Sequence, residues 1–386
     1  MSEAARPRVL IIDDRADSER SSLVNWEESV EVTVLHPQDV ALDDLVEADA
    51  VLVDYRLDHW SERDSLETLS LKPMDGLALA AVLRAHVERA TERPIALAIR
   101  SAHLNDLSGG FPPEPRVHIL SRRHNVEWIF PKTVPAGQDI AVHQVATLAS
   151  AVRRLPEAWP VEDPDETRRL VEVFMAIPDE PWAGLAWQDI EACHPPIHEL
   201  VRGTHGLAFL RWMLHRILPY PCFLSDSYRL AARLRITHES LISAMRDGLK
   251  TTMEPFSYKG ELAGFLGPRW WRCGVESFLW ELTDGNPFEP QRVRDLLSTE
   301  AGVALEATSS NQPVVCIDED YQVLPQGYDP IEAIRIQPDD WPAYADQCWT
   351  TIDLARGNPA LRAIVIEADR DRLNQDQGHE NLKRTG

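Results

Sequence analysis

The stretch VLVDYRL at residues 51–57 decides the fold that we expect for the first third of the chain. Three apolar residues run directly into Asp54, and a continuous apolar run bounded by polar residues is typical of a buried parallel strand. In open α/β sheets, ligands bind at the carboxyl ends of such strands. The sequence therefore places Asp54 where chemistry is expected.

Further apolar runs of strand length lie on both sides of this stretch. The expected strands span residues 8–12, 32–35, 50–53, 95–99 and 128–130. Helical periodicity fills the intervals at residues 18–26, 40–45, 77–89 and 140–154. Strands that alternate with helices in this way indicate an α/β domain with a doubly wound, five-stranded parallel sheet.

Polar side chains stand where these strands end. Asp13, Asp14 and Asp54 are three carboxylates that the topology brings to one edge of the sheet. Like charges so close repel one another unless a cation joins them, and Mg²⁺ prefers such oxygen ligands together with a phosphoryl group. Ser101 adds a hydroxyl group, and Lys132 adds a positive charge for a phosphoryl oxygen. Together these groups suit the formation of an aspartyl-phosphate.

On these residues, the segment from about 7 to 150 resembles the receiver domain of two-component response regulators. The matching fragments are, in chain order, IIDD, VLVDYRL, MDGLALAAVLR, IRSA and FPK. The resemblance implies a flavodoxin-like fold in which Asp54 accepts a phosphoryl group from a histidine kinase. It also implies that Asp13, Asp14 and Asp54 hold Mg²⁺. Ser101 would be the switch hydroxyl, and Lys132 would contact the phosphoryl group.

The chain departs from the family pattern around these fragments. The polar insertion HWSERDSLETLSLKP begins at His59 and lengthens the loop after Asp54. A second long polar segment follows Ser101, and Pro131 precedes the lysine where the family has a proline after it. Trp128 stands one place from the family's aromatic switch position. The conventional dimer surface is therefore in question, and a homodimer stays an open alternative.

Length and composition predict two domains. A chain of 386 residues is long for one core, and residues 155–165 (LPEAWPVEDPD) read as a proline-rich, acidic linker. It separates a receiver-like domain at 1–154 from a second domain at 166–386. Helical patterns dominate the second domain, with strand-like runs at 313–317 and 363–366. We expect a mainly α-helical domain with a few strands, and we recognise no family for it.

Net charge and cysteine content limit the partners and the cellular compartment that we expect for the protein. A formal charge of -23 disfavours a broad nucleic-acid-binding surface, which needs an excess of Lys and Arg. The sequence has no apolar run of transmembrane length and no signal-peptide pattern near its start. Five cysteines without CxxC pairs are typical of a reducing compartment. We therefore expect a cytoplasmic protein without a membrane segment.

Three features of the second domain invite functional interpretations. AARLRITHESLISAM, at residues 231–245, resembles a helix-turn-helix, although Arg235 stands where the turn usually has glycine. Two core helices joined by a tight turn are the preferred interpretation. Cysteine and histidine also gather here, but their spacing matches no Zn²⁺ pattern, so scattered residues are preferred. These residues are Cys193, His194, His198, His205, His215 and Cys222.

The third feature is PRWWRCGVESFLWEL, which begins at Pro268 and combines tryptophan with arginine. Stacked Trp and Arg side chains recognise bases, nucleotides or protein partners. A large aromatic core covered by Arg stems is the preferred alternative. The residues concerned are Trp270, Trp271, Trp280, Arg269 and Arg272.

The sequence thus predicts a response regulator that relays phosphorylation of Asp54 to a C-terminal regulatory or protein-interaction domain. DNA binding through residues 231–245, an unrecognised effector enzyme of a defence pathway and a store of phosphoryl groups remain as alternatives. No GxxxxGK, GxSxG, HExxH or GxGxxG motif occurs in the second domain. Enzyme activity beyond the receiver chemistry is therefore unsupported by the sequence.

Overall fold

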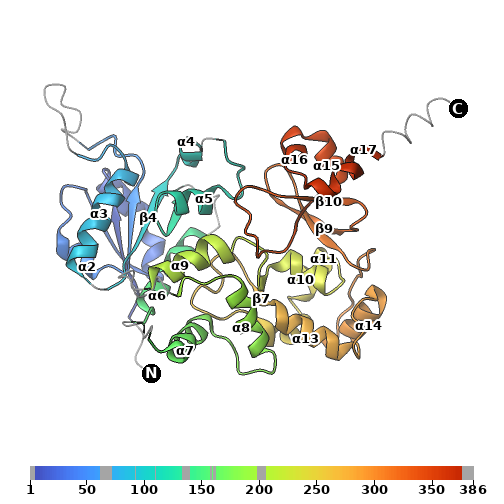
Figure 1. Cartoon of the computed structure of the whole chain (residues 1–386). Coiled ribbons are helices and arrows are strands. Elements are labelled where there is room, and N and C mark those ends of the chain that lie inside the picture. Colours follow the sequence, from blue (N-terminus) through green and yellow to red (C-terminus); the bar gives the residue numbers. More distant parts are fainter. Residues whose placement is uncertain are drawn as a thin grey trace.

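The structure is a computed structural model that describes residues 5–60, 72–91, 93–108, 110–132, 140–156, 159, 162–197 and 206–375. An α/β part formed by the first third of the chain lies on the left in Figure 1, beside a larger part formed by the remainder. The strands of the α/β part are β1 (Arg8–Ile12), β2 (Glu31–Leu35), β3 (Ala50–Asp54), β4 (Ala96–Ser101) and β5 (Trp128–Pro131).

These five strands are all parallel and form one sheet in the order β2-β1-β3-β4-β5. This is the doubly wound, flavodoxin-like strand order, with a switch point between β1 and β3. The expected fold class is confirmed, and each expected strand lies within two residues of its observed bounds.

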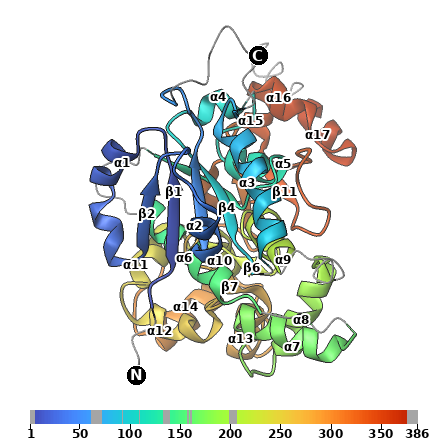
Figure 2. The ribbon, with the colours of Figure 1, turned by 90° about the vertical axis from the view of Figure 1, so that its left-hand side faces the viewer.

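The alternation of side chains along each strand explains why both faces of the sheet are covered. In β3, Leu52 joins one hydrophobic core, whereas Val51 and Val53 join a second core on the opposite face. Figure 2 shows α1 on one side of the sheet and α3 on the other. The helices of this part are α1 (Ala16–Ser22), η1 (Val24–Glu28), α2 (Leu42–Glu47), α3 (Gly76–Ala90), α4 (Leu104–Ser108), α5 (Arg116–Arg123) and α6 (Ile140–Arg153).

Two features of this part differ from the sequence-based expectation. The helix expected at 18–26 is divided into α1 and the 3-10 helix η1. The long polar segment after Ser101 contains α4 and α5, which periodicity did not predict. The inner face of α5 holds Ile119 and Leu120, but the helix is only eight residues long, too short for a convincing periodic signal.

The remainder of the chain is mainly helical with a small sheet, as expected. Its helices are α7 (Pro164–Met175), α8 (Ala183–Ala192), α9 (Leu207–Trp212), η3 (Met213–Ile217), α10 (Ser227–Arg233), α11 (His238–Ala244), α12 (Gly248–Met253), η4 (Glu254–Phe256), α13 (Arg272–Leu282), α14 (Pro290–Ala301), α15 (Ile352–Gly357), α16 (Pro359–Ala363), η5 (Glu367–Asp369) and α17 (Arg370–Gln375). No helix of the described residues is both long enough and apolar enough to cross a lipid bilayer.

A four-stranded sheet lies near the C-terminal end of the chain. It has the order β10-β11-β8-β9 and comprises β8 (Val314–Ile317), β9 (Val323–Tyr328), β10 (Ala333–Ile336) and β11 (Cys348–Thr351). A separate two-stranded ribbon pairs β6 (Leu224–Ser225) with β7 (Trp270–Trp271). The strand expected at 363–366 is wrong, because Ala363 ends α16 and only an isolated bridge joins Val365 to Ile336.

The two parts share one hydrophobic core. A single cluster of buried side chains includes Ile11 of β1, Leu148 of α6, Phe209 of α9 and Trp271 of β7. Leu155, inside the expected linker, is only 6 % exposed and belongs to the same cluster. The domain boundary at 155–165 stays a prediction, and buried apolar contact is continuous around it.

A buried glutamate also joins the two parts. Glu127, immediately before β5, is fully buried, and its carboxylate lies 3.0 Å from Arg84 of α3 and 2.6 Å from Arg211 of α9. The backbone N–H of Leu97 donates to the same carboxylate. Burial alone raises the pKa of Glu127, but Arg211 and Arg84 outweigh it and hold that pKa below its usual value.

Candidate metal centre

Three buried carboxylates meet at the carboxyl edge of the parallel sheet. Asp13 and Asp14 follow β1, and Asp54 ends β3, which is hydrogen-bonded to β1. Each offers an oxygen within 4.8 Å of the others, and all three residues are at most 8 % exposed. The structure therefore brings together the three aspartates that the sequence predicted as metal ligands.

Lys132 lies among these carboxylates. Its Nζ atom is 2.6 Å from Oδ2 of Asp13 and 2.8 Å from Oδ2 of Asp54. Burial raises the pKa of Asp54 to about 6, although the hydrogen bond and the charge of Lys132 oppose that shift. Asp13 and Asp14 raise the same pKa further, because their carboxylates repel the ionised form.

Asp14 carries the observation that tests whether a cation fits here. Its Oδ1 atom is buried and has no hydrogen-bond partner, whereas its Oδ2 atom accepts the backbone N–H of His59. An unpaired buried carboxylate oxygen is costly, and a divalent cation is the partner that such an oxygen lacks. The donor set, composed of oxygen atoms only, suits Mg²⁺.

Ser101 ends β4, the strand next to Asp54, and is 1 % exposed. Its Oγ atom accepts the backbone N–H of His103 at 2.9 Å, so the hydroxyl proton remains available for donation. The backbone N–H of Lys132 donates to the carbonyl oxygen of Ser101 at 2.9 Å. The predicted hydroxyl and lysine are thus neighbours on adjacent strand ends.

The Asp75–Gly76 pair of the MDGLALA fragment has a geometric explanation. A Cβ atom on Gly76 would lie 2.0 Å from the carbonyl oxygen of Asp54, so only glycine fits here. Gly76 also donates its N–H to Tyr55 O at 2.8 Å, and Asp75 caps α3 by accepting the N–H of Ala78. This pair anchors the start of α3 directly against the strand end that carries Asp54.

Sequence analysis missed a second layer of charge around the site. Arg100 forms a buried ion pair with Glu19 of α1, and its guanidinium lies 5.1 Å from the ring centroid of Trp26. Glu19 in turn approaches Lys132 Nζ at 4.0 Å. Glu19 lies in a short helix of mainly polar residues, and the sequence pattern of such a helix indicates a solvent-exposed position. The contacts of Glu19 with Arg100 and Lys132 therefore could not be predicted from the local sequence.

The helix-turn-helix candidate forms two helices joined by a tight turn. Arg235 adopts a left-handed backbone with φ of 59°, the conformation for which such turns usually have glycine. Arg233 pairs with Glu276 and lies 3.0 Å from Asp346, and Arg235 donates to the backbone carbonyls of Ala232 and Arg233. Carboxylates and backbone carbonyls thus already engage both of these arginines.

Several of the cysteine and histidine residues considered as zinc ligands have structural roles instead. His215 Nε2 is hydrogen-bonded to the carbonyl oxygen of Glu127 at 2.8 Å, and its ring stacks on Trp128. Cys193 and Cys222 are buried and free, as are the other three cysteines. His198 and His205 lie outside the described residues, and within those residues only the three aspartates form a metal-like cluster.

The aromatic segment is divided between core and surface. Trp270 and Trp271 are 4 % and 0 % exposed, which confirms the core interpretation for both. That interpretation is wrong for Trp280, which is 58 % exposed on α13. Arg272 pairs with Asp189 at 2.8 Å and with Asp346 at 3.1 Å.

No family model matches the chain, and no curated protein matches it. Among solved structures, the RcsB response regulator of Salmonella typhimurium, described for its conformational dynamism in DNA interaction, is similar to the chain at 12 % identity. The match covers 53 % of this chain and 93 % of that one, with a TM-score of 0.25. The fold assignment therefore rests on the strand order of the sheet itself.

Proposed function

We propose that the chain is a two-component response regulator whose α/β part accepts a phosphoryl group on Asp54 from a histidine kinase. The observation that carries this proposal is the meeting of Asp54 with Lys132, Asp13 and Asp14 at one strand edge. The resemblance of the IIDD, VLVDYRL, IRSA and FPK fragments to receiver domains supports it independently.

The chemistry assigns a role to each side chain. A carboxylate oxygen of Asp54 attacks the phosphorus of a phosphohistidine, the P–N bond breaks, and an acyl phosphate forms on Asp54. Lys132 forms an ion pair with the new phosphoryl oxygens, and the Ser101 hydroxyl group donates a hydrogen bond to one of them. Asp13, Asp14 and Asp54 would hold Mg²⁺, which supplies positive charge that stabilises the transferring group.

The added charge is relayed to the larger part of the chain. Lys132 follows β5, and Glu127 precedes the same strand and binds Arg211 of the larger part. A shift of Lys132 toward a phosphoryl group therefore pulls on a short strand whose other end is anchored outside the α/β part. We propose a regulatory or protein-interaction output, in the cytoplasm, where free cysteines are stable.

Intact-protein mass spectrometry tests this function. The chain is treated with Mg²⁺ and a small phosphodonor such as acetyl phosphate, and wild type is compared with Asp54→Asn. Asp75→Asn is the matched control, because asparagine caps a helix as well as aspartate does. We expect one phosphoryl adduct on wild type and on the control, and none on Asp54→Asn.

A wild-type chain that takes no phosphoryl group from the small donor or from any purified histidine kinase would contradict the proposal. A phosphoryl adduct that persists in Asp54→Asn would show that another residue is the phosphoryl acceptor.

A further inference from the structure

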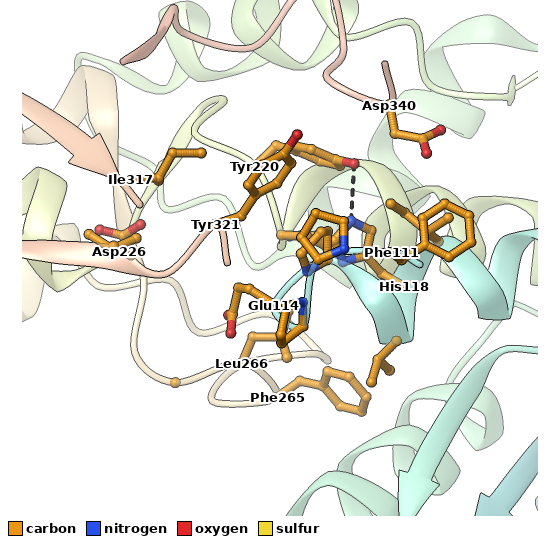
Figure 3. A pocket seen from close by; sticks show the side chains of 18 of the residues that line it. Phe111, Glu114, His118, Tyr220, Asp226, Phe265, Leu266, Ile317, Tyr321 and Asp340 are labelled. Atoms are coloured by element: carbon orange, nitrogen blue, oxygen red, sulfur yellow. Dashed lines mark hydrogen bonds between the residues drawn. The ribbon is translucent and has the colours of Figure 1, made fainter. Parts of the chain in front are cut away.

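A large cavity lies between the α/β part and the larger part, apart from the three aspartates. Its volume is about 1310 Å³, and its walls come from several separate segments of the chain. Figure 3 shows Phe111, Glu114 and His118 from the first part facing Tyr220, Phe265 and Tyr321 from the second. Small-molecule sites commonly occupy such places between domains.

Charged groups of both signs line the cavity. The guanidinium groups are those of Arg123, Arg229 and Arg269, and the carboxylates are those of Glu114, Asp226, Asp339 and Asp340. Asp226 is already engaged, because it pairs with the guanidinium of Arg229 and accepts the backbone N–H of Arg229 at 2.8 Å. The guanidinium of Arg229 therefore has its ion-pair partner inside the cavity wall, and the same carboxylate also attracts Arg269 over a longer distance.

Arg269 is held by hydrogen bonds to backbone carbonyl groups and not by an ion pair. Its guanidinium donates to the carbonyl oxygens of Pro268 at 3.0 Å and Leu218 at 3.1 Å. No carboxylate of the described residues lies within ion-pair distance of it. Burial lowers the pKa of Arg269, and the negative charge of Asp226 opposes that shift. Arg269 is partly buried, and a guanidinium in such a place binds carboxylate, sulfonate or phosphate groups well.

The remaining walls are aromatic and held in place. Tyr220 donates to or accepts from Nε2 of His118 at 3.0 Å, so its ring is fixed across the boundary between the two parts. Phe265 packs edge-on against Trp128, with ring centroids 5.0 Å apart. Rings fixed in this way form flat apolar walls without further loss of rotamer freedom when a ligand enters.

We propose that this cavity binds a small organic anion with a planar aromatic body, whose acidic group pairs with Arg269. The aromatic body packs between Tyr220 and Phe265, and Asp226 orients the neighbouring Arg229 rather than the ligand. None of Asp13, Asp14 and Asp54 lines the cavity, so this site is separate from the proposed phosphoryl acceptor.

A pair of fluorescent probes isolates the charge requirement. Anilinonaphthalene sulfonate has an aromatic body and an anionic group, and N-phenylnaphthylamine has the same rings without the charge. Both are titrated into the full-length chain. We expect saturable binding of one sulfonate probe per chain, about tenfold tighter than the neutral probe, the ratio typical of a charge-assisted contact.

Two variants and one control locate the binding. Arg269→Gln should remove the preference for the anionic probe, and Leu266→Trp should weaken both probes because the larger ring fills cavity space. Arg294→Gln is the control, since Arg294 of α14 pairs with Asp295 and does not line the cavity. Leu266→Trp keeps the charge of Arg269, so it still tests binding in the cavity if Arg269→Gln does not fold.

The results separate the outcomes cleanly. Loss of the preference in Arg269→Gln, or weaker binding of both probes in Leu266→Trp, supports the site when Arg294→Gln behaves like wild type. Equal affinity of wild type for the two probes, absence of saturable binding, or binding unchanged in both cavity variants overturns it.

Discussion

The Nζ atom of Lys132 lies 2.8 Å from Oδ2 of Asp54, so a buried ammonium already neutralises the carboxylate that we propose as phosphoryl acceptor. The same ammonium is 2.6 Å from Asp13. One positive charge thus lies between two buried carboxylates and offsets their mutual repulsion.

Lys132→Met should destabilise the metal-free chain by about 3 kcal/mol, because it leaves buried carboxylates without their cation. Saturating Mg²⁺ should restore a larger share of stability in this variant than in wild type. Urea unfolding followed by circular dichroism, with and without Mg²⁺, measures both effects. Lys250→Met, at an exposed position of α12, is the control. Identical losses with and without Mg²⁺ would argue against a shared cation site.

Asp14→Asn should weaken Mg²⁺ binding at least tenfold, because a charged ligand with an unpaired oxygen is replaced by a neutral amide. Isothermal titration calorimetry provides the measurement. Asp17→Asn changes the same charge at a fully exposed side chain nearby and should leave the affinity within about twofold. If the two variants bind Mg²⁺ equally well, Asp14 is not a ligand.

Glu127→Gln should lower the free energy of unfolding by about 3 kcal/mol, since it leaves Arg84 and Arg211 facing a neutral group in the core. Because one hydrophobic core spans both parts, wild type should unfold in one transition. Urea denaturation monitored at several wavelengths tests both statements. Glu300→Gln, on the exposed face of α14, is the control. Two separate transitions in wild type would show that the parts unfold independently.

Stability should fall as the pH decreases below about 6.5. Burial lowers the pKa of His215 to about 4 and that of His118 to about 3, so both are neutral when folded. The unfolded chain protonates these histidines below about pH 6.5, whereas the folded chain does not until the pH approaches 3 to 4. The free energy of unfolding is therefore highest above about pH 6.5 and decreases as the pH falls through this interval. The slope is up to about 1.4 kcal/mol per pH unit for each histidine.

His118→Phe should therefore flatten the dependence of the unfolding free energy on pH between about 6.5 and 4. Urea midpoints across this range provide the comparison, with His86→Phe, at an exposed position of α3, as control. Parallel curves for wild type and His118→Phe would mean that His118 does not contribute to the acid sensitivity.

The chain should show no salt-dependent retention on DNA. Arg233 is engaged by Glu276 and Asp346, and the exposed face of α11 carries Glu239 beside the apolar Ile242. Electrophoretic mobility shift at low salt, where phosphate contacts are strongest, is the sensitive measurement. Binding that falls steeply with salt and is lost in Arg233→Gln would support the DNA-binding alternative instead.

The sequence predicted the α/β sheet and its carboxylate edge because their determinants are local. Every residue of β3 is buried, so its strand reads as an uninterrupted apolar run into Asp54. The requirement for glycine at position 76 comes from the close approach of Asp54 O, a contact that the sequence analysis did not predict. The run at 363–366 failed for the opposite reason, since four apolar residues fit a buried helix end as well as a strand.

The unpredicted features depend on contacts between distant positions. Arg100 and Glu19 pair across 81 residues, and His118 meets Tyr220 across 102. Neither pair stands in a pattern with a fixed spacing. The cavity likewise exists only because segments far apart in the chain enclose it. Such features follow from how the two parts pack, and single-sequence periodicity carries no information on that packing.

The end of β5 contacts both proposed sites, because Pro131 lines the cavity and the next residue, Lys132, forms an ion pair with Asp54. Thermodynamic reciprocity then applies to any occupant of the cavity. If phosphorylation of Asp54 multiplies the affinity of the cavity for its ligand by some factor, the ligand must shift the phosphorylation equilibrium by that same factor. The chain would then behave as a coincidence detector, in which a metabolite and a kinase each bias the response to the other.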